Sequence, residues 1–162
     1  MRHKIFDEIL TSKFSDIIFQ PTKNIIASTN MYVINFVKEK RIYSLHISCF
    51  LRILLNNQIV LTSTDECFDK NYKPITEYDK KYSLVHYNIS NVKQFALGAV
   101  VSSIEISGCD DLVITLSNNM IIEIRPDCLM DSFEYYRLFE YTNPINQVIV
   151  SCNIDNGNKI KK

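Results

Sequence analysis

The stretch "SGCDDLVITLSNNMIIEIRPD", residues 107–127, decides the fold class of this 162-residue chain. Two apolar runs rich in β-branched residues flank the pair Asn118-Asn119. Such runs are typical of β-strands, and Asn tolerates the positive φ angles that a tight hairpin turn requires. The stretch therefore predicts a β-hairpin.

A second stretch of the same kind, "SCFLRILLNNQIVLTSTDE" at residues 48–66, centres on Asn56-Asn57. The residues around the two hairpins also correspond, so that 25–90 and 97–152 resemble two copies of a β-meander. The sequence leaves open whether the copies arose by duplication, because antiparallel meanders resemble each other in any case.

Further strands are expected on both sides of the hairpins, because β-branched and aromatic residues are enriched there. Ile5, Ile9 and Leu10 have helical spacing and predict a short helix within residues 3–14. The fold class that we expect is mainly β: an antiparallel bent sheet or a partly open β-barrel with a short N-terminal helix. Residues 1–155 would form one globular domain and 156–162 a flexible tail. The additional strands are expected at 16–19, 31–37, 42–48, 83–89, 100–107, 133–141 and 147–152.

Composition fits a globular cytoplasmic protein. Hydrophobic residues make up 46% of the chain, enough for a full core, and the 4 Pro and 3 Gly leave little room for linkers. Five cysteines without a C-x-x-C pair favour free thiols in a reducing compartment. The start "MRHKIFDEIL" has no apolar signal region, and no apolar run is long enough to span a membrane.

The two parts of the chain differ in charge although the whole is neutral. Residues 1–60 hold eight Lys or Arg against four Asp or Glu, whereas 102–155 hold nine acids against two arginines. This asymmetry indicates either a face that attracts a basic partner, or charges that mingle over one surface after folding. An acidic second half disfavours nucleic-acid binding.

No motif indicates catalysis. With three glycines, a glycine-rich phosphate loop is close to excluded. The adjacent pair Asp110-Asp111 is better suited to forming a turn than to acid–base chemistry, because Asp bonds to nearby backbone through its side chain. The cysteine and aspartates at 109–111 point to opposite faces of a strand, which disfavours a metal site. We therefore expect neither enzyme activity nor a cofactor nor a metal.

Two alternatives to a binding protein remain open. His46 and His86 lie in predicted strands and would serve a small enzyme or a ligand-binding barrel if they met across an internal cavity. A structural or assembly subunit of a phage or secretion system would have the same β-rich pattern. The oligomeric state is not indicated by the sequence.

The aromatic segment "FEYYRLFEY", residues 133–141, is predicted to have two unlike faces. The odd-numbered residues from Phe133 to Tyr141 are expected to face the core. The even-numbered residues, Glu134, Tyr136, Leu138 and Glu140, are expected to face a partner, since tyrosine supplies contact area and carboxylates attract basic ligands.

The order "DLVITLSNNMIIEI" followed by Glu134-Tyr135-Tyr136-Arg137-Leu138 resembles a group of small β-rich immunity proteins from bacteria. These are encoded beside polymorphic and contact-dependent growth-inhibition (CDI) toxins. Their common pattern is Asp-Leu, a strand, an Asn-Gly-like turn, a second strand and Glu-x-Trp-x-Leu. The resemblance covers residues 97–141, with Asn119 in place of Gly and Tyr136 in place of Trp.

The resemblance implies a non-catalytic cytoplasmic inhibitor that binds a cognate toxin domain. The acidic second half suits a basic toxin such as a nuclease, because opposite charges speed association. We therefore expect an acidic partner-binding surface formed by Asp110, Asp111, Asp127, Asp131, Glu134, Tyr136 and Glu140.

Overall fold

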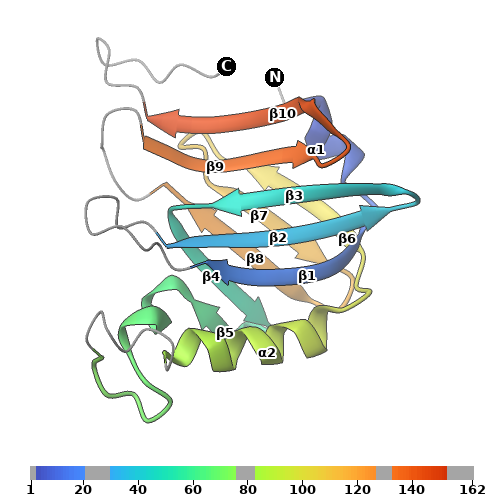
Figure 1. Cartoon of the computed structure of the whole chain (residues 1–162). Helices are drawn as coiled ribbons and strands as arrows, with labels where there is room; N and C mark the ends of the chain where they lie inside the picture. Colours follow the sequence, from blue (N-terminus) through green and yellow to red (C-terminus); the bar gives the residue numbers. More distant parts are fainter. Residues whose placement is uncertain (1–2, 21–29, 76–82, 127–132, 153–162) are drawn as a thin grey trace.

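The computed structural model describes residues 3–20, 30–75, 83–126 and 133–152. They form two antiparallel five-stranded sheets that lie face to face, and one continuous hydrophobic core contains residues of both (Figure 1). The expectation of a mainly antiparallel β fold is confirmed. The two sheets do not close into a barrel. No helix in the described ranges is both long and apolar enough to cross a membrane.

The first sheet, in front in Figure 1, has the strand order β1-β2-β3-β9-β10. Its strands are β1 (Lys13–Gln20), β2 (Met31–Lys38), β3 (Arg41–Ile47), β9 (Phe133–Glu140) and β10 (Asn143–Cys152). The charged segment 38–41 makes the turn between β2 and β3, with Glu39 at φ 57°.

The second sheet lies behind the first and has the order β5-β4-β8-β7-β6. The chain enters it directly after β3, through Ser48 and Cys49. Its strands are β4 (Phe50–Leu55), β5 (Gln58–Thr62), β6 (Val101–Ile106), β7 (Leu112–Leu116) and β8 (Met120–Arg125).

The core consists of rows of aliphatic side chains that cross each sheet in register. One row crosses the first sheet and another crosses the second, and nearly all of their members are buried. Because side chains alternate between the two faces of a strand, one inward position recurs on each neighbouring strand. The rows are Ile17, Ile34, Leu45, Leu138 and Val148 in the first sheet, and Leu61, Ile53, Ile122, Ile114 and Ile104 in the second.

Both predicted hairpins are present, and they lie side by side because β4 pairs with β8. Asn56 and Asn57 have φ angles of 50° and 64°, as a tight two-residue hairpin turn requires. In the second turn Asn119 alone has a positive φ, of 63°. The side chain of Asn118 instead accepts a hydrogen bond from the Met120 amide at 3.2 Å.

The correspondence between residues 25–90 and 97–152 extends no further than these hairpins. Strand β3 is central in the first sheet, whereas its counterpart β6 is an edge strand of the second sheet. The strand β9 corresponds to a helix in the other half. The two halves therefore do not fold alike.

The strand predicted for residues 83–89 is wrong: this segment begins helix α2 (Leu84–Ala96). Five residues at helical spacing point into the core, and the spacing becomes evident only over the full thirteen-residue segment. Helix α2 lies across the lower edge of the molecule in Figure 1 and packs on β1 and β5. The buried residues are Leu84, Val85, Ile89, Val92 and Ala96.

The expected N-terminal helix is confirmed but short. Helix α1 (Lys4–Glu8) lies beside β10 at the opposite edge from α2 (Figure 1). A 3-10 turn, η1 (Ser63–Cys67), follows β5. Four backbone hydrogen bonds of 2.8 to 3.0 Å join residues 11–14 to residues 98–101 and so connect the two sheets at one corner. The predicted tail 156–162 lies outside the described residues.

Candidate functional site

Asp110 and Asp111 lie in the turn between β6 and β7, as expected. Ser107 organises this turn: its Oγ accepts hydrogen bonds from the amides of Cys109 and Asp111, both at 3.2 Å. Asp110 has a φ of 65°, a left-handed conformation that Asp tolerates better than most residues. This conformation turns its side chain inward, and Asp110 is only 4% exposed.

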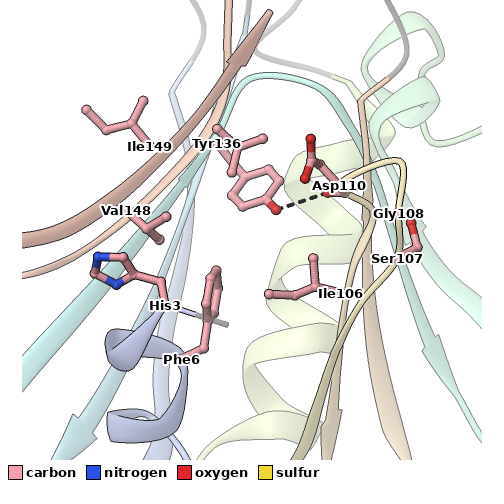
Figure 2. A pocket seen from close by; sticks show the side chains of 10 residues that line it. His3, Phe6, Ile106, Ser107, Gly108, Asp110, Tyr136, Val148 and Ile149 are labelled. Atoms are coloured by element: carbon pink, nitrogen blue, oxygen red, sulfur yellow. Dashed lines mark hydrogen bonds between the residues drawn. The ribbon is translucent and has the colours of Figure 1, made fainter. Parts of the chain in front are cut away.

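Tyr136 connects this turn to the first sheet. Its side chain is 1% exposed and its hydroxyl donates a hydrogen bond to the backbone carbonyl of Asp110 at 3.0 Å (Figure 2). Burial, followed by the negative charge of Asp110, raises the pKa of the Tyr136 phenol, so it stays a neutral donor. Because Asp110 precedes β7 and Tyr136 belongs to β9, this bond holds one sheet to the other.

The predicted faces of β9 are reversed from Tyr136 onward, whereas Tyr135 is buried as predicted. Tyr136, Leu138 and Glu140 are buried, while Arg137 and Phe139 are half-buried on the outer face. The register explains the reversal, because Leu138 pairs with Leu45 and Tyr136 with Ile47, both core residues of β3.

Glu140 is buried because polar groups surround its carboxylate. The amide of Asn146 donates to Glu140 at 3.1 Å and to Glu8 at 2.7 Å. Arg41 lies 3.9 Å from Glu140, and Thr142 donates to it at 3.2 Å. Glu140 therefore helps to fix the β9–β10 turn against α1, and its charge is compensated inside the fold.

The other predicted acids have different surroundings. The Arg137 guanidinium forms a bidentate ion pair with the Glu134 carboxylate, with N–O distances of 2.6 and 3.1 Å. Asp111 lies on the outer face of the second sheet, diagonal to Glu105 of β6, since the Ser107 amide bonds to the Asp111 carbonyl at 3.0 Å and extends the β6–β7 ladder. Asp127 and Asp131 lie outside the described residues.

A pocket of about 410 Å³ opens between α1, β10 and the β6–β7 turn (Figure 2). Phe6, Ile106 and Val148 supply apolar walls, and Tyr136 and Asp110 also line the pocket. His3 stands on the α1 side, where its Nδ1 accepts a hydrogen bond from the Ile5 amide at 3.3 Å. An apolar pocket with a few fixed polar groups is a common form of binding site.

The structure does not bring His46 and His86 to one site. His46 is on the outer face of β3, with its ring 4.9 Å from that of Phe139, and His86 is on α2, with its ring 5.4 Å from that of Phe19. Burial and the nearby Arg137 lower the pKa of His46. Neither histidine lines the pocket described above.

Metal ligands and cysteines give no other site. In the described ranges no group of three or more His, Cys, Asp or Glu side chains is placed to hold a metal ion. Cys49 is buried, and Cys67 and Cys109 are exposed thiols.

Sequence reasoning missed several residues of the site. In the sequence Glu105 contributes only to the overall charge, and no pattern points to the pocket residues His3, Phe6, Ile106 and Val148. They come from three distant segments of the chain, and only the packing of α1 and β10 beside the β6–β7 turn brings them together.

Comparisons with protein-family models, curated proteins and solved structures found no match for this chain.

Proposed function

We propose that this protein is an immunity protein that binds a cognate toxin domain and neutralises it without catalysis. The binding surface is centred on the β6–β7 corner, which we define as Glu105, Ser107 and Asp111. This surface is smaller than the acidic surface expected from the sequence, because Asp110, Tyr136 and Glu140 are buried and Glu134 is paired with Arg137.

The observation that carries the proposal is the charge at this corner. Glu105 and Asp111 are neighbours on the outer face of the second sheet, and no described Lys or Arg forms an ion pair with either of them. By contrast, Glu123 on the same face is paired with Arg52 and Arg125. Acids without a nearby cation project a negative potential that attracts a basic partner.

A basic partner that acts on nucleic acid fits this potential, since nucleases need cations to bind phosphates. The inhibitor would then work in the cytoplasm, where Cys67 and Cys109 remain thiols. The rigid support of the corner, through Ser107 and the Tyr136 hydrogen bond, lets it bind with little loss of conformational freedom.

Co-expression with the product of the adjacent open reading frame tests the proposal. That product should arrest growth when it is expressed alone, and this chain should restore growth and co-purify with it. Charge reversal by Glu105→Lys together with Asp111→Lys should reduce the rescue. The same exchange at Glu39, an exposed acid in the β2–β3 turn, is the matched control and should leave the rescue intact. A neighbour that is harmless alone, or that never binds, counts against the function.

A further inference from the structure

We propose that the toxin partner covers the outer face of the second sheet with an apolar patch, and that Lys or Arg residues border this patch on the side of the β6–β7 corner. This footprint rests on the proposed function and adds to it the chemistry of the partner's contact surface. It is supported by the small size of the corner, by an apolar row beside it and by the ion pairs on the same face.

The β6–β7 corner by itself is too small for a stable complex. A specific protein–protein interface buries about 800 Å² on each partner and includes about 20 residues on each side. The corner consists of three residues, so the partner must also cover a surface that adjoins it. The outer face of the second sheet is continuous with the corner, because β6 and β7 belong to both.

Two rows of outward side chains cross this face and lie side by side. Residues that pair directly across neighbouring strands place their side chains next to one another on one face of the sheet. The second row ends at the corner, with Glu105. The rows are Ile59, Leu54, Ile121, Thr115 and Ser103, and Thr62, Arg52, Glu123, Val113 and Glu105.

The first row is apolar over three neighbouring strands, and we call Ile59, Leu54 and Ile121 the apolar row. Ile59 is 57% exposed, and Leu54 and Ile121 are half-buried. Val113, in the second row, is half-buried as well. Contiguous apolar side chains bordered by polar residues are typical of protein interaction sites, and covering them stabilises a complex through the hydrophobic effect.

The charges of the face determine which side of the partner is basic. The Arg52 Nε donates to the Glu123 carboxylate at 2.7 Å, and Arg125 lies 3.7 Å from the same carboxylate, so cations of this chain already compensate it. Glu105 and Asp111 lie at the β6–β7 end and form no ion pair with a described Lys or Arg. A partner is therefore favoured when its cations lie at that end and its apolar side chains lie over the apolar row.

Methyl-detected NMR on the wild-type chain measures the footprint. The full chain with labelled Ile, Leu and Val methyl groups is mixed with the unlabelled product of the adjacent open reading frame. Irradiation of that partner's protons should attenuate the methyl signals of the apolar row. The methyl signals of Ile18 and Ile42, which are 37% and 40% exposed on the outer face of the first sheet, should keep their intensity.

A pair of substitutions separates the apolar row from the corner. Leu54→Gln with Ile121→Gln removes apolar contact without adding charge, and should raise the Kd at least about tenfold through faster dissociation. Ile18→Gln with Ile42→Gln is the matched control and should leave the Kd unchanged. Charge reversal at the corner should instead slow association. If a variant loses its native amide spectrum, the wild-type footprint decides.

Attenuation that spares Leu54 and Ile121, or equal dissociation rates for the wild type and their double variant, would overturn the footprint and leave a growth-restoring function standing. An adjacent product that is harmless alone and does not bind would overturn both. Concentration-dependent shifts of the Leu54 and Ile121 methyl signals in the chain alone, lost in the double variant, would assign this face to a second copy instead of the toxin.

Discussion

The substitution Tyr136→Phe removes one hydroxyl group from the contact between the two sheets. That hydroxyl donates to the Asp110 carbonyl at 3.0 Å inside the protein, and the phenylalanine ring fills the same space. A buried hydrogen bond between neutral groups contributes about 1 kcal/mol, and an acceptor left without a partner adds to the loss. We expect the free energy of unfolding to fall by about 1 to 2 kcal/mol, less than a cavity-forming substitution costs.

The matched control is Tyr32→Phe. Tyr32 is as deeply buried as Tyr136, and burial, followed by the charge of Glu66, raises its pKa. Its hydroxyl makes no hydrogen bond of ordinary geometry with the described residues. The Glu66 carboxylate lies near that hydroxyl without a hydrogen bond of ordinary geometry, so we expect its removal to change the free energy of unfolding by no more than about 0.5 kcal/mol.

Urea unfolding followed by far-ultraviolet circular dichroism measures both variants, and the chain has no tryptophan to complicate the signal. The m-value should stay constant, since neither variant alters the surface exposed on unfolding. In thermal scans a loss of 1 to 2 kcal/mol corresponds to about 2 to 8 °C for a protein of this size. If Tyr136→Phe is no more destabilising than Tyr32→Phe, the bond between the sheets does not have the stabilising role that we assign to it.

Three further predictions test the fold and its charges. Val85 is fully buried on α2, so Val85→Lys should lower the free energy of unfolding by more than about 4 kcal/mol. Tyr87 is 63% exposed, so Tyr87→Lys should change it little. A strand would place both residues on one face, so equal effects of the two substitutions would contradict the helix. Asn146→Asp replaces the amide that donates to both Glu8 and Glu140 by a third carboxylate. In urea unfolding experiments the free energy of unfolding should fall by about 2 kcal/mol at pH 7, and the loss should shrink towards pH 4 as carboxylates take up protons. Burial raises the pKa values of Tyr32 and Tyr136 in the folded protein, so the unfolded chain loses these protons at a lower pH. The free energy of unfolding should therefore fall as the pH rises above about 10, and it should fall less in the Tyr32→Phe, Tyr136→Phe double variant.

The sequence was sufficient for those parts of the fold that depend on neighbouring residues. Each hairpin has its two strands and its Asn-Asn turn within one short stretch, so local chemistry determines it. The face of β9 was different, because aromatic and charged residues occur on both sides of the strand. There the pairing with β3, about ninety residues away in the chain, decides which side is buried.

The candidate site was predictable only in part, for the same reason. The turn at Asp110 and Asp111 is local and was expected. The burial of Glu140 depends on Arg41 and Asn146, and the pocket depends on α1 and β10, which reach it from the two ends of the chain. Helix α2 was missed because its first seven residues also fit a strand, and its helical spacing appears only farther along.

The rate at which the chain associates with its toxin partner tests the central claim most directly. Stopped-flow mixing at several salt concentrations would compare the wild type with the Glu105→Lys, Asp111→Lys double variant and with Glu39→Lys. If the β6–β7 corner attracts a basic toxin, the double variant should associate about tenfold more slowly at low salt and show a weaker salt dependence, while Glu39→Lys should behave like the wild type. Identical rates and identical salt dependence in all three proteins would contradict the account.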